Sequence, residues 1–206
     1  MSTIEGGMVC TNDKSIYERI RIMRGHGLLR ESRDKTLKRK ALKRHNTLNK
    51  EFLFLLPGYN LRSTEINAVY GLSQIKSLDI KNKIRTKNFL YFLKNLDNSK
   101  YFTKFDTNGS CNYAFIIIFN KINRNEKFRK KFENMLFKNN IEFRRGLSGG
   151  GDQTKQPYLD FFKQKRKIVG KLKNTNIVHN FGYYIGNYPM LKMNKIKKIC
   201  NILNSI

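Results

Sequence analysis

The first residues of this sequence predict a strand and a helix that lack the elements they would need to pack against. Residues 6–11 form a short apolar segment that ends at a turn, which favours a buried strand. Residues 14–24 carry Ile16, Ile20 and Met23 at helical spacing, and glycines follow them. A strand that feeds a helix is a piece of α/β architecture, and alone it leaves its apolar faces uncovered. We therefore expect this chain to enter a larger α/β domain part-way through.

The middle of the chain predicts a long helix that joins two units. Ser63 or Thr64 can cap this helix, and apolar positions then recur at helical spacing across most of residues 61–98. We interpret residues 61–98 as a connecting helix. It would separate residues 1–60, the remnant of a large domain, from residues 99–206, a small C-terminal domain.

The last part of the chain predicts a small α+β domain. Residues 112–120 are rich in β-branched and aromatic residues, which is typical of a central strand. Phe128, Phe132 and Leu136 lie at i, i+4 and i+8 and predict a helix over residues 126–139. The other expected elements are strands at 141–143 and 179–188 and a helix at 195–204. The predicted fold class is therefore an α/β portion followed by an α+β portion.

The chain is strongly basic, with 42 Lys and Arg against 15 Asp and Glu and a net charge of +27. Such a charge attracts phosphate and permits nucleic-acid binding. It also fits a compositional bias, because Asn and Ile are in excess together with Lys. The charge is spread along the chain and no nucleic-acid motif accompanies it, so we do not expect nucleic acid as the partner. The densest basic stretch, residues 33–50, is a solvated helix face, an insertion or a site for a diphosphate.

Cysteines and apolar segments indicate a soluble, cytoplasmic protein. Cys10, Cys111 and Cys200 are isolated, without metal-ligand spacing, and read as small buried residues in a reducing compartment. No signal peptide is visible, and the longest apolar run, residues 113–119, is far shorter than the ~20 residues of a membrane span. We expect no membrane partner and no metal site.

Two segments suit anion binding. Asn60 and Arg62 stand at the entrance of the connecting helix, where free backbone N–H groups can join them around a phosphate; an ordinary capped helix with an exposed arginine is the alternative. Arg144 and Arg145 precede a glycine-rich loop and can clamp a phosphorylated ligand; a plain flexible loop is the alternative. For His179, a structural role is the simpler interpretation from the residues alone.

Five stretches, taken together and in order, resemble the DegT/DnrJ/StrS family of pyridoxal-phosphate (PLP) enzymes that modify nucleotide-linked sugars. They cover nearly the whole chain and are residues 1–9, 24–31, 58–68, 144–158 and 181–189. The resemblance implies the C-terminal part of a fold-type-I PLP-dependent aminotransferase that forms a homodimer. It also implies that Asn60 reaches the cofactor phosphate of the neighbouring subunit. Arg62, Arg144, Arg145 and His179 would lie near the cofactor or the nucleotide sugar.

The same resemblance predicts that the cofactor-bonding residue is absent. In the family a Lys, or a His in the 3-dehydrase branch, stands six residues before the position of Glu5, which falls upstream of Met1. Asp152 and Lys155 stand where Asn and Arg are expected, which puts substrate contacts in doubt. We therefore expect a fragment of an aminotransferase or 3-dehydrase for polysaccharide or lipopolysaccharide biosynthesis, inactive without a partner or its missing N-terminal half. A basic nucleic-acid-binding protein is the alternative function.

Overall fold

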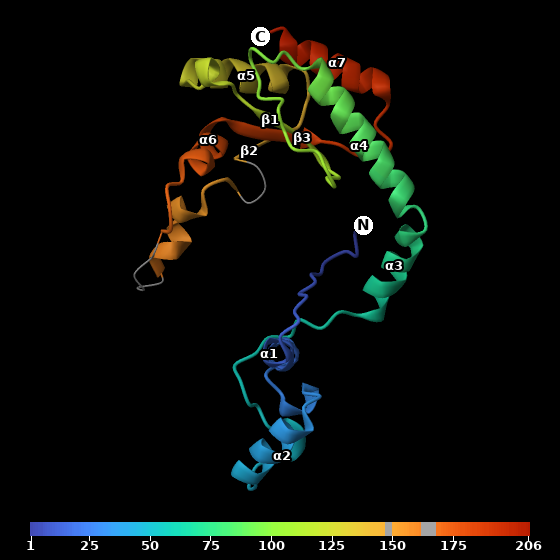
Figure 1. Ribbon diagram of the computed structural model, residues 1–206, viewed down its shortest axis with the longest axis vertical. Coiled ribbons are helices and arrows are strands. Elements are labelled where there is room, and N and C mark those ends of the chain that lie inside the picture. Colours follow the sequence, from blue (N-terminus) through green and yellow to red (C-terminus); the bar gives the residue numbers. More distant parts are fainter. Residues whose placement is uncertain (147–149, 162–167) are drawn as a thin grey trace. The chain divides into compact units, whose positions relative to one another are not determined.

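The computed structural model describes residues 1–146, 150–161 and 168–206 and divides into two compact units (Figure 1). The first unit is Met1–Leu78 and the second is Asp79–Ile206. In the part of the chain that the structure describes, no helix is both long enough and apolar enough to cross a membrane.

Short helices and turns build the first unit. Its α-helices are α1 (Lys14–Arg24), α2 (Lys35–Arg44) and α3 (Glu65–Ile75), and its 3₁₀ turns are η1 (Leu29–Glu31) and η2 (Lys50–Phe52). Asp13 and Asp34 cap α1 and α2, because each carboxylate accepts two backbone N–H groups of the first turn. The predicted bounds of the first helix are confirmed. Its core is small and centres on Leu29, Ala41 and Leu53.

Two expectations for the first unit are wrong. Residues 6–11 are not a strand but an extended, exposed segment, with Met8 87% and Val9 68% exposed. A strand needs a neighbour for its backbone N–H and C=O groups, and no segment of the described chain pairs with this one. In α1 the buried residues are Glu18 and Ile22, whereas Ile16 on the predicted apolar stripe is 47% exposed.

The single connecting helix expected over residues 61–98 is two helices. Helix α3 ends at Ile75 and α4 (Leu78–Asn95) begins after a two-residue turn. The reason is local: both the backbone N–H and the hydroxyl of Ser77 donate to the Gln74 carbonyl, which a continuous helix would offer to residue 78. The division between the two units falls just after this turn, between Leu78 and Asp79.

The second unit is a three-stranded antiparallel sheet covered by helices. The strands, in the spatial order β1-β3-β2, are β1 (Ala114–Ile118), β3 (Gly182–Gly186) and β2 (Arg144–Arg145). The remaining elements are α4, η3 (Lys121–Asn123), α5 (Glu126–Lys138), η5 (Gln153–Lys155), η6 (Pro157–Phe161), α6 (Lys173–Phe181) and α7 (Met193–Asn204). Figure 1 shows α5 and α7 on one side of the sheet, α6 on the other, and α4 running past one end of the sheet.

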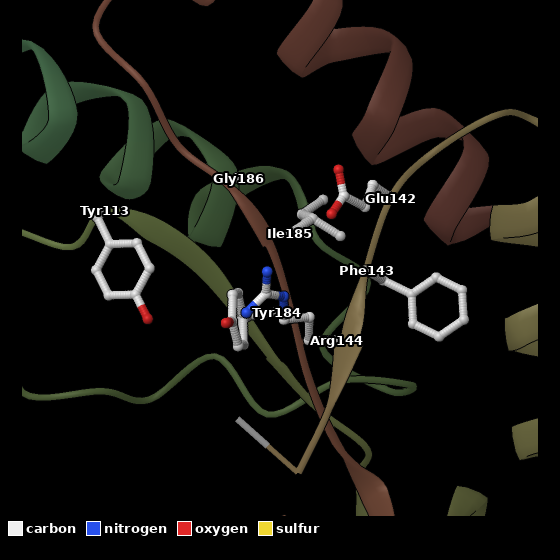
Figure 2. Close-up of a pocket in the computed structure, with 7 residues that line it drawn as sticks. All are labelled: Tyr113, Glu142, Phe143, Arg144, Tyr184, Ile185 and Gly186. Atoms are coloured by element: carbon white, nitrogen blue, oxygen red, sulfur yellow. The ribbon is translucent and has the colours of Figure 1, made fainter. Parts of the chain in front are cut away.

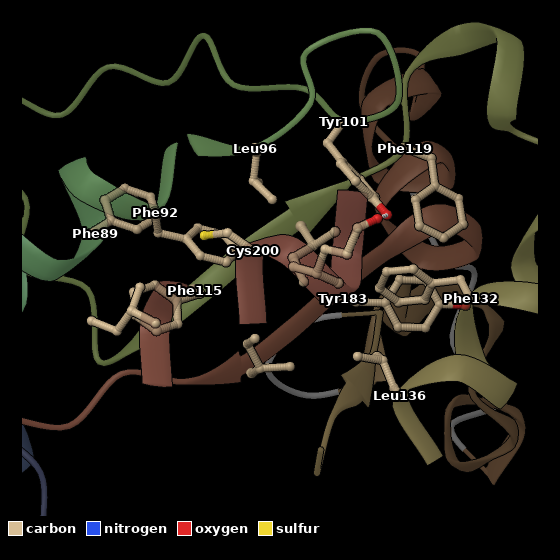
Figure 3. Close-up of a cluster of buried hydrophobic side chains, with 14 of the residues drawn as sticks. Phe89, Phe92, Leu96, Tyr101, Phe115, Phe119, Phe132, Leu136, Tyr183 and Cys200 are labelled. Atoms are coloured by element: carbon tan, nitrogen blue, oxygen red, sulfur yellow. Dashed lines mark hydrogen bonds between the residues drawn. The ribbon is translucent and has the colours of Figure 1, made fainter. Parts of the chain in front are cut away.

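An aromatic core joins the sheet to α4, α5 and α7 (Figure 3). Phe115 stacks on Phe92 of α4 at a ring-centroid distance of 4.4 Å, and Phe119 meets Phe132 of α5 at 4.9 Å. The Tyr101 hydroxyl is satisfied inside this core, since it donates to the Leu203 carbonyl of α7 at 2.7 Å. Desolvation by this burial raises the pKa of Tyr101, so its hydroxyl stays protonated.

Several details of the second unit differ from expectation. The short strand expected at 141–143 begins three residues later, at Arg144–Arg145. The strand expected at 179–188 is only Gly182–Gly186, because its first residues complete α6, a helix that the apolar pattern did not predict. Of the three cysteines only Cys200 is buried, which raises the pKa of its thiol to about 11, whereas Cys10 and Cys111 are exposed.

Replacing Phe132 tests the aromatic core. Phe132 is fully buried on α5, so F132A should lower the free energy of unfolding by about 3–5 kcal/mol. Phe137 on the same helix is 81% exposed, and F137A should therefore change stability little. Urea titration followed by circular dichroism measures both; equal losses for the two variants would contradict this packing.

Glu18 makes stability of the first unit depend on pH. Burial would raise the pKa of Glu18, but the Ser32 hydroxyl (2.6 Å) and the Arg33 amide (2.9 Å) donate to its carboxylate and hold the pKa below the ordinary 4.5. This stabilisation is present above that value and is lost as pH falls through the lower folded-state pKa. E18Q should lower the free energy of unfolding by about 1–2 kcal/mol near pH 7. It should also flatten the acid side of the plot of that free energy against pH. E51Q, at an exposed glutamate, is the control in the same titrations.

Candidate functional site

A backbone ladder positions Asn60 and Arg62 in the first unit. The His26 N–H donates to the Tyr59 carbonyl at 2.9 Å, the Tyr59 N–H donates to the Met23 carbonyl at 2.8 Å, and a β-bridge joins Asn60 to Gly25. These bonds attach the segment before α3 to the C-terminal end of α1. Two stretches of the family resemblance, 24–31 and 58–68, are therefore one structural feature.

Two glycines make this close approach possible. A Cβ on Gly27 would lie 1.7 Å from the Leu56 carbonyl oxygen, and one on Gly58 would lie 2.2 Å from the Gly27 nitrogen. Gly27 also has φ +82°, a conformation that side chains disfavour. Any larger residue at either position would push the two segments apart and move Asn60 with them.

The Asn60 side chain faces solvent. The residue is exposed, and within the described chain its carboxamide makes no hydrogen bond. Thr64, the N-cap residue of α3, lies four residues later, and its side chain makes no capping hydrogen bond, so first-turn N–H groups remain available. An amide donor and an uncapped helix N-terminus suit a phosphate group.

Arg62 has an internal partner. Its Nη2 lies 2.6 Å from Glu31 Oε1, and the Arg62 side chain is 41% exposed. Glu31 itself packs over Gly25, where a Cβ would lie 2.6 Å from its Cγ. Because Glu31 compensates its charge, Arg62 is less suited to bind an anion than its sequence position predicts.

Arg144 and Arg145 lie on opposite faces of the sheet and do not form the joint clamp that their sequence suggests. Arg144 pairs in register with Tyr184, and Arg145 pairs with Tyr183. Arg145 contacts Glu133 of α5 at 3.6 Å, and the Tyr183 hydroxyl donates to the same carboxylate at 2.5 Å. Only Arg144 faces the side of the sheet away from α5.

The side of the sheet away from α5 carries a pocket of about 350 Å³ around Arg144 (Figure 2). The rings of Tyr113 and Tyr184 meet edge to face there, with centroids 5.9 Å apart. Its lining residues are Tyr113, Glu142, Phe143, Arg144, Tyr184, Ile185 and Gly186. Within the described chain, Glu142 and Arg144 form no ion pair, so both signs of charge border an aromatic surface. Side chains of an extended segment alternate between its two faces, so Glu142 and Arg144 share one face. This alternation is the sequence signal that could have predicted their meeting in the pocket.

His179 is held within the second unit. Its Nδ1 accepts the Asp152 N–H at 3.1 Å, which assigns the proton of a neutral ring to Nε2. Gly151 allows this approach, because a Cβ there would lie 2.6 Å from Nδ1. The two residues that depart from the family pattern each have an internal partner. The buried Asp152 carboxylate accepts the Thr154 hydroxyl, which lowers the Asp152 pKa, and Lys155 donates to Asn176 of α6 at 2.6 Å.

Comparison with known proteins decides the family. The model of the DegT/DnrJ/EryC1/StrS aminotransferase family matches residues 1–204. The chain belongs to this family. It is 28% identical over 209 residues to the GDP-4-keto-6-deoxy-D-mannose 3-dehydratase of Yersinia pseudotuberculosis, covering 98% of this chain and 50% of that protein. The lipopolysaccharide biosynthesis protein RfbH of Salmonella typhimurium is 28% identical over 141 residues, covering 65% of this chain and 30% of RfbH.

The solved structures agree with this family membership. The Escherichia coli GDP-4-keto-6-deoxy-D-mannose-3-dehydratase with bound hydrated PLP superimposes with a TM-score of 0.76 at 25% identity, over 98% of this chain and 50% of that one. The expected fold class, that of a PLP-dependent aminotransferase, is confirmed. The chain spans about half the length of the curated relatives it matches most fully.

The close approach of the two backbones at Gly27 and Gly58 can be tested by hydrogen exchange. G27A and G58A should each expose the Tyr59 and Leu61 amides, which donate to Met23 and Arg24, and raise their exchange rates about tenfold or more. G7A is the matched control, since a Cβ on Gly7 would have no atom within 4 Å. Unchanged exchange in G27A would contradict the close approach.

Proposed function

We propose that this chain acts, together with a partner or an upstream half, as a PLP-dependent enzyme on a nucleotide-linked keto-sugar. Family membership over residues 1–204 supports the enzyme class. The single observation that supports a bound cofactor is the exposed Asn60 side chain, which makes no hydrogen bond to any described residue and precedes an uncapped helix. PLP, when bound, supplies an electron sink for bond breaking next to nitrogen. The family resemblance implies that the residue that would bond it stands six positions before Glu5.

Asn60 and the first turn of α3 would hold the cofactor phosphate through N–H donors. The apolar surface of α3 supports the proposal that this phosphate belongs to a neighbouring subunit. Ile66, Val69 and Leu72 are each 64–71% exposed, which is unusual for three residues of one short helix. A homodimer partner or a separate N-terminal half would cover them.

The pocket at Arg144 would take part of the nucleotide sugar. Arginine binds phosphate oxygens in bidentate geometry, and tyrosine rings accept sugar or base faces. Substrate roles for Arg62, Arg145 and His179 stay predictions, since the first two pair with glutamates and the third bonds the 150–155 segment.

Two relatives are named GDP-4-keto-6-deoxy-D-mannose 3-dehydratase, which makes 3-dehydration the first reaction to test and aminotransfer the second. The similarity to RfbH supports a place in lipopolysaccharide biosynthesis. Because nucleotide sugars are made in the cytoplasm, that compartment is part of the proposal.

Reconstitution tests this function. The chain alone should show no PLP absorbance beyond free cofactor, whereas a mixture with an N-terminal half taken from a full-length family member should bind PLP. N60A should weaken that binding about tenfold through loss of charge-assisted hydrogen bonding to phosphate. N46A, at an exposed asparagine of the same unit, should not.

Spectroscopic titration of PLP measures both variants. Equal affinities for N60A and wild type would remove Asn60 from the cofactor site. Failure of every mixture to bind PLP, together with tight salt-dependent binding of DNA by the chain, would favour the nucleic-acid alternative.

A further inference from the structure

The first residues of the chain are fixed against one face of α3. The Asn67 Nδ2 donates to the carbonyls of Thr3 and Glu5, both at 2.8 Å. The Thr64 hydroxyl bonds to Asn67 Oδ1, which turns the amide so that its NH₂ group faces the chain. One side chain thus bonds the backbone on both sides of Ile4.

Gln74 and Gly71 complete this attachment of residues 2–5 to α3, which we call the seat. The Ser2 N–H donates to Gln74 Oε1 at 2.9 Å, and Gln74 Nε2 donates back to the Ser2 carbonyl, as a neighbouring strand would. Gly71 lies between the two amides along the helix, and a Cβ there would come within 3.2 Å of Thr3 Cγ2. Asn67, Gly71 and Gln74 stand at i, i+4 and i+7, so they share one helix face.

The seated segment is strained. Ile4 has φ +70°, in the left-handed region that a β-branched side chain enters only at a cost of about 1–3 kcal/mol. Its side chain is 64% exposed, so packing does not force this conformation. Hydrogen bonds to the carbonyls of Thr3 and Glu5 on either side do. A strained backbone held by dedicated amide side chains is typical of a positioned functional segment.

We propose that Asn67, Gly71 and Gln74 are positioning residues that set the direction of the backbone leading out of the cofactor-bonding residue. The inference rests on the proposed function, in which that residue stands six positions before Glu5. By fixing the carbonyls of Ser2, Thr3 and Glu5 to a helix, the seat limits how far that residue can turn away from the cofactor.

The seat itself is tested in the chain as it exists, with the protease Glu-C. Cleavage after Glu5 requires its carbonyl, which Asn67 holds. N67D keeps the shape and the oxygen facing Thr64 but replaces the donor by a carboxylate, so cleavage should be about tenfold faster. S73A is the matched control, because among the described residues the Ser73 hydroxyl bonds only to the Tyr70 carbonyl of its own helix. Mass spectrometry of the released pentapeptide gives the rate, and a wild-type rate in N67D overturns the seat.

The positioning role is tested in the reconstituted protein. N67D should shift the pH at which the absorbance of bound PLP changes, while S73A should not, and N67Q, which restores an amide donor, should recover most of the wild-type profile. If wild type binds PLP and N67D keeps its profile, the positioning role is overturned and the proposed function stands. If wild type binds no PLP, the proposed function fails, and with it the positioning role, whatever the cleavage rates show.

Discussion

The first unit depends on direct contact between two backbones, at Gly27 and Gly58. Its hydrophobic core is too small to hold long loops in place, since only Leu29, Ala41 and Leu53 are buried together. The order of residues 54–62 therefore comes from N–H donors and carbonyls of the α1 end, which reach each other because neither segment carries a Cβ at the crossing. Asn60, with little packing of its own, takes its position from that crossing.

Local signals predicted the elements that are determined locally. Helix α1 begins after the capping Asp13 and ends at Gly25, and α5 has its apolar residues at helical spacing, so both bounds follow from sequence. The strand expected at 6–11 failed because a strand is defined by its neighbour, and apolar composition says nothing about whether one is present. The break between α3 and α4 came from a serine bonding backward, which periodicity does not register.

The candidate site shows the same division between composition and geometry. Two adjacent arginines look like one cluster in a sequence, yet a strand turns Arg144 to the pocket and Arg145 to Glu133. Strand periodicity contained that answer. The partners of Arg62 and His179 could not be predicted from periodicity, because Glu31 and Asp152 are far from them in the sequence and meet them only in the folded chain.

The net charge of this chain is a poor guide to its binding partners, whereas its sequence motifs predict the family correctly. The excess of 27 positive charges is the most conspicuous property of the sequence, but it lies largely on solvated surfaces such as α2, most of whose basic residues are exposed. The residues that we propose for the function are few and mostly uncharged: glycines that allow a crossing, and the amides Asn60, Asn67 and Gln74. An amide can donate and accept at once without a counter-ion, so it can fix a strained backbone or a phosphate in a chain that is already highly basic.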